Sequence, residues 1–343
     1  MTISERPRRF GPQLLAAMLW LAVAAAGPAC AQTIKVATLA PEGSGWMTQM
    51  RAAAKASEER TEGRVTFKFY PGGVMGNDAI VLRKIRLGQL QGSAFTGSEA
   101  STIYPSAQLY SLPFLFRERG EVDAVRAAFD DKLRAGFEAK GFQVLSISGV
   151  GFALMMSKSD IAQRAALQQR KMWVPNNDLI AERTFRGGGI TPIPLPLADV
   201  FTALQTGLID TVANTPAGAV ALQWHGSLRQ VLDLPLSYVI GYVLVDRRSW
   251  SKLSPADQAA VLAAFASSSE LIDRGNRESD QQALEAMLSM GTKLVKPDAQ
   301  EVTAWEGVGR DIVDTLVAED RLDASLVSGV RSLLAERRTR SDH

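Results

Sequence analysis

The chain alternates between short segments with the two-residue period of strands and longer segments with the spacing of helices. Residues 33–39 form an apolar strand, and residues 44–61 carry apolar side chains at helical intervals. Residues 65–70 alternate apolar and polar side chains, and Pro71-Gly72-Gly73 predicts a turn after them. Strands and helices keep alternating further along the chain, which predicts an architecture of α/β layers.

One predicted helix is much longer than the others. The remaining strands are predicted at residues 93–96, 142–148, 153–157, 171–174, 208–213, 238–245 and 292–296, and shorter helices at 78–87, 121–140, 178–185 and 197–206. Ser254-Pro255-Ala256-Asp257 has a capping serine with proline at the first helical position, and so predicts a helix start. That helix extends to about Met290, which gives a length of about 50 Å at ~1.5 Å per residue.

The N-terminus has the features of a secretory signal. Arg6, Arg8 and Arg9 precede an apolar run at residues 14–26, which is too short to span a bilayer. Ala29-Cys30-Ala31 then matches a small-x-small cleavage site. We therefore predict that residues 1–31 are a signal peptide and that the mature protein is periplasmic. The alternative is a lipid anchor at Cys30.

Composition limits the chemistry that the mature chain can carry. Cys30 is the only cysteine, so cleavage leaves neither a disulfide nor a cysteine metal site. The predicted signal holds three Arg and one Glu, which leaves 35 basic and 35 acidic side chains. This balance gives no argument for a nucleic-acid partner. No later segment is apolar for long enough to cross a membrane.

The sequence also lacks the motifs of common enzymes. Its two histidines are His225 and His343, and it contains no Gly-x-Ser-x-Gly, His-Glu-x-x-His or Gly-x-Gly-x-x-Gly motif. The Asp and Glu residues show no paired-carboxylate spacing. We therefore predict no catalytic residues, no metal-ligating residues and no cofactor. A single bound cation is left open.

Three phrases carry a resemblance to a known family. The strongest is Asp199-Val200-Phe201-Thr202-Ala203-Leu204-Gln205-Thr206-Gly207-Leu208-Ile209-Asp210, preceded by Lys171-Met172-Trp173-Val174-Pro175. Leu112-Pro113-Phe114-Leu115-Phe116 and Leu39-Ala40-Pro41-Glu42-Gly43-Ser44-Gly45-Trp46 are the others. In this order and spacing, the chain resembles the solute-binding proteins of TRAP transporters, the DctP-like family.

The resemblance implies an α/β fold of the type II periplasmic-binding-protein class. Two lobes would enclose a ligand cleft, and the long helix would span both of them. The implied boundaries are residues 32–147 with 238–279 for lobe I, residues 148–237 with 280–335 for lobe II, and a tail at 336–343.

The resemblance also implies ligand-binding residues. Trp173 stands where the family usually has an arginine that binds a substrate carboxylate, and Asn214 matches a family Asn-Pro whose amide faces the ligand. Many family members have a second basic residue near the position of Phe152, and this chain has none there. Phe152 and Met155 are expected to line the pocket. Gly73 and Trp46 would face the cleft from lobe I.

Replacing arginine by tryptophan changes what the cleft can bind. Arginine pairs with a carboxylate through two parallel hydrogen bonds. Tryptophan offers an apolar face and one N–H donor, and an unpaired buried carboxylate costs several kcal/mol. We therefore expect a neutral, apolar or aromatic ligand, or a cation stacked on indole. The alternative is an organic acid bound by a lobe I arginine such as Arg83, by a cation or by backbone N–H groups.

The expected function is that of a transport receptor. Ligand binding would close the two lobes, and the closed form would deliver the ligand to a permease. The implied partners are the small and large TRAP membrane subunits, or a tetratricopeptide-repeat protein. The alternatives are a ligand-sensing subunit of a signalling system and an enzyme in the same fold, against which the missing motifs argue.

Overall fold

One long strand, β4 (Phe142–Ser157), connects the two halves of the molecule. The protein is described here from a computed structural model, which defines residues 31–341. Nearly all of the predicted signal peptide and the last two residues lie outside the described part. Within residues 31–341, none of the helices combines the length and the apolar content needed to cross a membrane.

The sheet order is β10-β8-β4-β9-β3-β1-β2, and β7 also pairs with β4. The strands are β1 (Gln32–Ala37), β2 (Val65–Tyr70), β3 (Gly92–Thr96), β7 (Thr211–Asn214), β8 (Gln230–Leu232), β9 (Ser237–Asp246) and β10 (Lys293–Val295). A separate parallel pair is formed by β5 (Trp173–Pro175) and β6 (Ile193–Leu195). The first part of β4 pairs with β9, and its end pairs with β7 and β8.

We use the name lobe I for the half built on β1, β2, β3 and the start of β4, and lobe II for the half built on β7, β8, β10 and the end of β4. The residue boundaries predicted from the sequence stay a prediction. Two segments expected as separate strands, 142–148 and 153–157, are one continuous strand, since β4 runs through both lobes.

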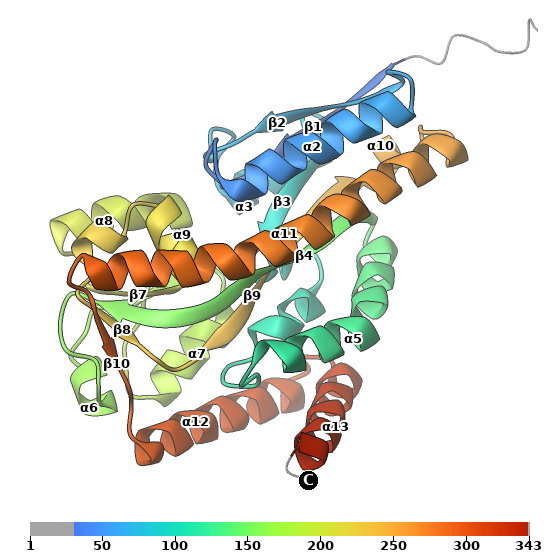
Figure 1. The fold of residues 1–343 in the computed structure, drawn as a ribbon. Coiled ribbons are helices and arrows are strands. Elements are labelled where there is room, and N and C mark those ends of the chain that lie inside the picture. The colour runs from blue at the N-terminus through green and yellow to red at the C-terminus, as the bar shows by residue number, and fades with distance from the viewer. Residues whose placement is uncertain (1–30, 342–343) are drawn as a thin grey trace, which may run out of the picture.

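Helices cover both faces of each half (Figure 1). They are α2 (Gly45–Arg60), α3 (Asp78–Arg86), α4 (Gly97–Ala100), α5 (Arg119–Ala139), α6 (Arg164–Leu167), α7 (Leu179–Gly187), α8 (Val200–Thr206), α9 (Pro216–Ala221), α10 (Arg247–Trp250), α11 (Pro255–Ser289), α12 (Ala299–Ala318) and α13 (Ala324–Ser341), with 3-10 turns η1 (Pro105–Ser111), η2 (Leu197–Asp199) and η3 (His225–Ser227).

The predicted long helix is confirmed as α11, which is 35 residues long. The Ser254 side chain accepts a hydrogen bond from the Asp257 N–H at 3.1 Å, and Pro255 occupies the first turn. Figure 1 shows α11 extending from the neighbourhood of α2 in lobe I to α9 in lobe II. The two-lobed α/β architecture with a helix that spans both lobes therefore agrees with the prediction.

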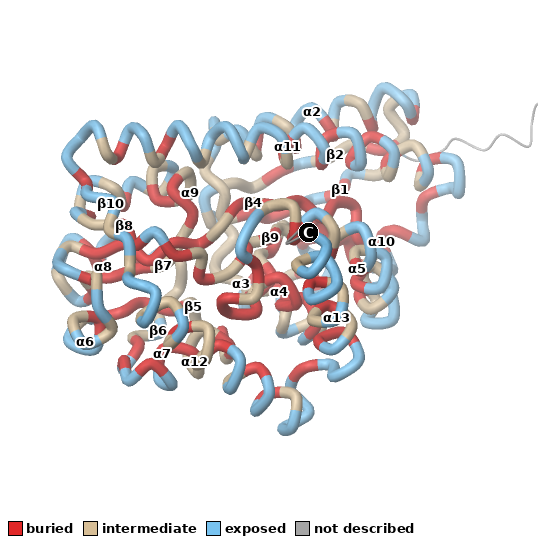
Figure 2. The backbone as a smooth tube through the Cα atoms, turned by 60° about the horizontal axis from the view of Figure 1, so that its bottom comes forward, coloured by how far each residue is buried: buried red, intermediate tan, exposed pale blue. Residues whose placement is uncertain are grey.

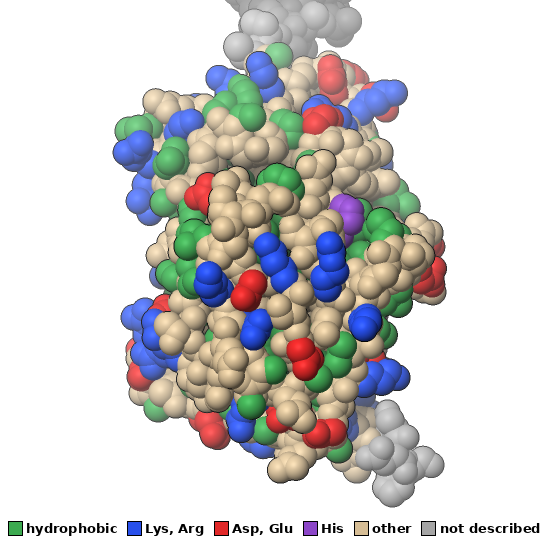
Figure 3. Space-filling view, turned by 90° about the vertical axis from the view of Figure 1, so that its left-hand side faces the viewer, with side chains coloured by type: hydrophobic (Ala, Val, Ile, Leu, Met, Phe, Trp, Pro, Cys, Tyr) green, Lys and Arg blue, Asp and Glu red, His purple; other side chains and the backbone are tan. Residues whose placement is uncertain are grey.

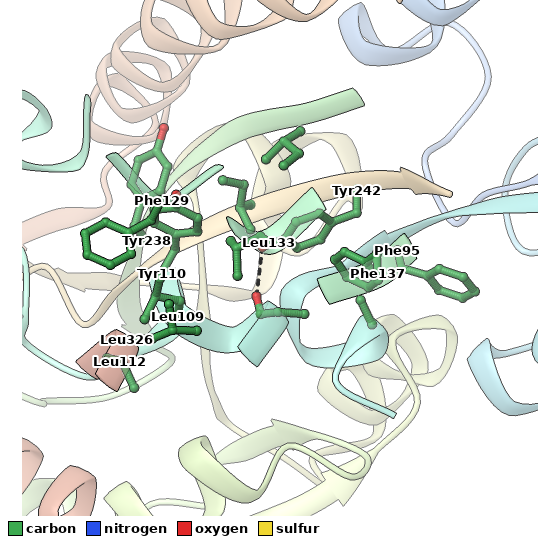
Figure 4. Packing of buried hydrophobic residues seen from close by; sticks show 14 of the residues in the cluster. Phe95, Leu109, Tyr110, Leu112, Phe129, Leu133, Phe137, Tyr238, Tyr242 and Leu326 are labelled. Atoms are coloured by element: carbon green, nitrogen blue, oxygen red, sulfur yellow. Dashed lines mark hydrogen bonds between the residues drawn. The ribbon is translucent and has the colours of Figure 1, made fainter. Parts of the chain in front are cut away.

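Apolar side chains fill the space between the sheet and the helices. Figure 2 shows that the buried positions concentrate on the central strands and on the inner faces of the helices. In lobe I, Tyr110 of η1 and Phe129 of α5 belong to the same apolar cluster as Tyr238 and Tyr242 of β9 (Figure 4). The Tyr242 hydroxyl donates to the Ala107 carbonyl at 2.9 Å, which satisfies a polar group that would be costly to bury unpaired.

Candidate functional site

A hollow lies at the ends of β1 and β3 in lobe I, on the side where the predicted cleft residue Gly73 is found. It is small, with a volume of about 10 Å³, which is room for about one water molecule, and it opens to solvent. It is lined by Ala37, Thr38, Leu39, Gly73, Met75, Gly76, Asp78, Val81, Ser93, Ala94, Phe95 and Glu99. The polar side chains of this lining carry hydroxyl or carboxyl groups, and the described lining includes neither Lys nor Arg.

Two loops build the wall of this hollow. The Gly73 N–H donates to the Thr38 carbonyl at 3.0 Å, and the Thr38 hydroxyl accepts from the Ala40 N–H at 3.0 Å. Gly73 has a φ of 74°, and a Cβ there would lie 3.0 Å from a methyl carbon of Leu39. Glycine is therefore needed where the loop after β2 approaches the loop after β1.

Glu99 gives the hollow its distinctive chemistry. Its carboxylate accepts hydrogen bonds from the Thr96 N–H at 2.8 Å and from the Thr96 hydroxyl at 3.1 Å, as part of a capping box. Burial, together with the charge of Asp78, raises the pKa of Glu99 to about 7. The carboxyl group is therefore partly protonated near neutral pH and can donate as well as accept a hydrogen bond.

On the lobe II side, Asn214 ends β7 beside Leu154 of β4. Its side-chain oxygen accepts from the Thr215 N–H at 2.8 Å. Among the described residues, no partner is found for its amide nitrogen, and the residue is half-buried. Asn214 therefore keeps an amide donor without a partner among the described residues, and its contact with a ligand stays a prediction.

The long helix binds the segment of β4 that passes between the lobes. Asp273 accepts from the Gly149 N–H at 2.5 Å, and the Asn276 amide donates to the Gly149 carbonyl at 2.7 Å. The β4–β9 register shifts between Gly149 and Gly151. Gly151 has a φ of 152°, and a Cβ there would lie 1.9 Å from a carboxylate oxygen of Asp280. These contacts identify residues 149–151 as the candidate hinge.

Asp280 links this hinge to the neighbourhood of Asn214. It accepts a hydrogen bond from the Ala217 N–H at 3.0 Å, at the start of α9. Burial raises the pKa of Asp280 to about 6, although its hydrogen bonds and the charge of Arg119 act in the opposite direction. The sequence alone gave no sign of this carboxylate, because 63 residues separate it from Ala217.

Trp173 lies in the core of lobe II. It is only 4% exposed and packs edge-to-face on Trp224, with ring centroids 5.4 Å apart. Its indole N–H donates to the Leu195 carbonyl at 3.0 Å. The single N–H donor is therefore used within the fold, and only the ring remains for contact with a ligand.

The other predicted ligand residues are dispersed. Met155 is fully buried among lobe II core residues, so its side chain offers no surface to a ligand in this conformation. Phe152 is half-buried and packs on Tyr238 with ring centroids 5.2 Å apart. Trp46 is half-buried against the core under α2. The structure thus places Gly73 in the lining of the hollow, and the assignment of all six residues to a ligand site stays a prediction.

Asp178 is a further polar residue that the sequence analysis missed. It caps α7, since its carboxylate accepts from the Ala181 N–H at 2.9 Å. The same carboxylate accepts from Ser98 and Gln108, which belong to lobe I. Its position three residues after Pro175 predicts a helix cap but not an interlobe contact.

Within residues 31–341, no group of three or more His, Cys, Asp or Glu side chains is arranged to hold a metal ion. The carboxylates described above act instead through hydrogen bonds to backbone N–H groups, hydroxyls and amides. The features that bear on function are the small hollow of lobe I and the glycine segment 149–151, where β4 passes from one lobe to the other.

Comparisons with known proteins agree with this geometry. The family model of bacterial extracellular solute-binding protein family 7 (DctP) matches residues 36–320. The C4-dicarboxylate-binding periplasmic protein DctP of Rhodobacter capsulatus is 26% identical over 284 residues, which cover 82% of this chain and 84% of the relative. The 2,3-diketo-L-gulonate-binding periplasmic protein YiaO of Escherichia coli K12 is 24% identical and covers 80% and 83%.

Solved structures share the fold. The sugar acid binding protein DctPAm of Advenella mimigardefordensis, in complex with galactonate, superposes with a TM-score of 0.83 at 20% identity, covering 90% of this chain and 99% of that one. A TRAP periplasmic solute-binding protein of Sulfurospirillum deleyianum with bound succinate gives 0.80 at 20% identity, covering 89% and 99%. The fold and the family match together lead to one conclusion: this chain belongs to bacterial extracellular solute-binding protein family 7, the DctP family of TRAP solute receptors, which are binding proteins and not enzymes.

Proposed function

We propose that this protein is an extracytoplasmic receptor that binds a small organic molecule between its lobes and delivers it to a TRAP-type secondary transporter. The observation that carries the proposal is the family match over residues 36–320, on a fold whose two halves are connected by the long strand β4. Residues 1–31 would direct export to the periplasm. The small and large TRAP membrane subunits would be its partners.

The ligand, in this proposal, is not held by an arginine–carboxylate salt bridge. Two observations support this. Trp173 stands where the resemblance expects the arginine, and its indole N–H is bonded to the Leu195 carbonyl. The hollow of lobe I is lined by Asp78 and Glu99 and by hydroxyl groups. Two carboxyl groups disfavour an anion in low dielectric, whereas they suit a hydroxylated, neutral or amine-bearing ligand.

The relatives give the alternative. DctPAm was solved with galactonate and the Sulfurospirillum protein with succinate, both of which are organic acids. An acid could be accommodated here by Arg119, which lies 5.2 Å above the Tyr238 ring beside Phe152. Arg119 also pairs with Asp123 at 3.0 Å, so a ligand carboxylate would compete with that ion pair.

Mass spectrometry tests the ligand class directly. The mature protein would be purified from the periplasm and measured under native and then denaturing conditions, so that any co-purifying molecule is released and identified. We expect a neutral, aromatic or amine-bearing compound. Recovery of a small organic acid would overturn the ligand proposal and leave the receptor proposal intact.

Binding measurements then compare matched ligands. Calorimetry with galactonate and with galactitol presents the same polyol with and without a carboxylate. We expect the acid to bind no better than the neutral polyol. The Glu99→Gln variant keeps the shape of the hollow and removes the titrating carboxyl group. A ligand whose amine contacts Glu99 would therefore bind this variant more weakly.

A sensing subunit of a signalling system would use the same cleft, and a tetratricopeptide-repeat protein is an alternative partner. Co-purification with candidate membrane subunits separates these roles from transport. The receptor proposal fails if the purified protein binds no small molecule and shows no change in lobe separation with any extract fraction tested.

A further inference from the structure

A row of cationic residues crosses the outer end of the lobe II sheet. We call it the cationic row, and its members are Lys171, Lys158, Arg229 and Lys293. Each stands at or beside the end of a different strand. They come from sequence positions up to 135 residues apart, so only the fold brings them together.

Backbone hydrogen bonds fix the order of the row. The Asp210 N–H donates to the Lys171 carbonyl at 3.1 Å, and the Lys158 N–H donates to the Asp210 carbonyl at 2.9 Å. The Arg229 N–H donates to the Ser157 carbonyl at 2.8 Å, and the Lys293 N–H donates to the Arg229 carbonyl at 2.9 Å. Since neighbouring strands lie about 4.8 Å apart, the four residues form a continuous line across the sheet end.

No member of the row forms an ion pair with a carboxylate among the described residues. The Lys158 ammonium donates to the Leu204 carbonyl, and the Lys171 ammonium donates to the Gly207 carbonyl at 2.9 Å. The Arg229 guanidinium donates to the Gly226 and Leu228 carbonyls at 3.0 and 2.9 Å. These carbonyls orient the cationic groups without neutralising their charge.

Acidic residues only partly balance the row. Asp210 lies within it, but its carboxylate accepts from the Lys171 N–H and the Thr211 hydroxyl. Asp160 lies just beyond Lys158 and accepts from the Ala162 N–H. Figure 3 shows this face of the molecule, on which blue side chains gather across the middle with few red ones among them.

Exposed apolar side chains flank the row. Leu208, next to Gly207, is 52% exposed, and Leu294, next to Lys293, is 36% exposed. A surface that combines unpaired cations with protruding leucines has the composition of a contact surface rather than of a merely solvated one.

We propose that the cationic row binds an acidic segment of a partner protein. Charge complementarity is the main argument, because four cations in a line, three of them oriented by carbonyls, match carboxylates carried along an extended chain. The Lys158 and Lys171 ammonium groups are held against carbonyls, so that side-chain carboxylates can reach them more readily than the headgroups of a flat lipid surface. This surface lies outside the ligand hollow, and the proposal does not depend on the identity of the ligand.

The test uses the full mature protein and a labelled peptide. Fluorescence anisotropy would follow binding of a short fluorescein-labelled peptide of Glu and Ser, with a Gln and Ser peptide as control. We expect binding of the Glu peptide only, with an affinity that falls steeply between about 50 and about 500 mM NaCl, because exposed ion pairs are screened.

A matched pair of variants locates the contact. Lys171→Glu, Arg229→Glu and Lys293→Glu together reverse three exposed members of the row. Arg60→Glu, Arg86→Glu and Lys252→Glu together make the same change of net charge at exposed positions of lobe I. We expect the row variant to lose at least about tenfold in affinity and the lobe I variant to stay within about twofold of the wild type.

Three outcomes would overturn the proposal: equal losses in both variants, no binding of the Glu peptide, or binding of anionic phosphatidylglycerol vesicles through the row with no binding of the peptide. A version with Gln at the same three row positions keeps the test informative if the charge-reversed protein is unstable. Circular dichroism and thermal melting check that each variant is folded.

Discussion

The Ser98 hydroxyl donates a hydrogen bond to the Asp178 carboxylate at 2.5 Å, and this bond joins α4 of lobe I to α7 of lobe II. The Gln108 amide donates to the same carboxylate at 2.9 Å, also from lobe I. Asp178 is buried, and burial raises its pKa although these hydrogen bonds act in the opposite direction. One carboxylate therefore couples the cap of a lobe II helix to the contact between the lobes.

We predict that Asp178 and Ser98 are energetically coupled. Asp178→Asn and Ser98→Ala should each destabilise the protein, because a buried partner is left unpaired, by about 1–3 kcal/mol. In a double-mutant cycle measured by urea unfolding, the coupling energy should be at least about 1 kcal/mol. Asparagine still caps helices well, so the Asn variant separates the interlobe contact from the cap. Strictly additive effects would contradict the prediction.

Glu99 should make stability depend on pH. Its folded pKa is raised to about 7 from an ordinary value of 4.5. Its contribution is therefore fully present below about pH 4.5 and is lost as the pH rises through about 7. Compared with the wild type, Glu99→Gln should gain about 1–3 kcal/mol between pH 5 and pH 8.5.

Urea unfolding of both proteins across this pH range is the measurement for Glu99. Glu58→Gln, on the exposed side of α2, controls for the loss of a carboxylate. A stability difference between wild type and Glu99→Gln that does not change with pH would show that Glu99 ionises normally.

Gly151 should tolerate no side chain. Gly151→Ala places a Cβ 1.9 Å from an Asp280 carboxylate oxygen, at a φ of 152°. We expect a loss on the order of 3 kcal/mol, since both the clash and the backbone strain must be relieved. Gly275→Ala, in α11 with open space around it, should instead stabilise the protein by about 0.5–1 kcal/mol.

Thermal and urea unfolding of the two alanine variants provide the comparison, and small-angle scattering follows the separation of the lobes. A Gly151→Ala protein as stable as Gly275→Ala would contradict the assignment of residues 149–151 as a strained hinge.

Trp173 should tolerate phenylalanine better than arginine. Trp173→Phe removes the donor to the Leu195 carbonyl and keeps an aromatic ring against Trp224, which should cost about 1–2 kcal/mol. Trp173→Arg puts a guanidinium into a site that is 4% exposed and should cost on the order of 3 kcal/mol or more. Chemical denaturation of both variants is the measurement. Equal stability of Trp173→Arg and wild type would mean that the site opens onto a solvated cleft.

Much of the architecture could be predicted from the chain alone. Local sequence patterns are sufficient to predict a helix start or a strand when the residues that cause it lie within that segment. The capping serine and proline at 254–255 specify the start of α11, and the two-residue period over 65–70 specifies β2. The prediction of two separate strands at 142–148 and 153–157 was wrong, because the segment between them, which contains glycines 149 and 151, continues the same strand. In the fold they form a bulge within one strand, stabilised by the distant residues Asp273 and Asn276.

The site was less predictable, because its chemistry depends on residues that only the tertiary structure brings together. By itself, the sequence determined the family, the order of the elements and the absence of an arginine at position 173. The fold decided that the Trp173 N–H is bonded to Leu195, that Glu99 lies beside Asp78, and that Asp178 reaches Ser98 across the lobes. The physical reason is that burial and long-range hydrogen bonding set the state of a polar group, and both arise only when distant segments pack together.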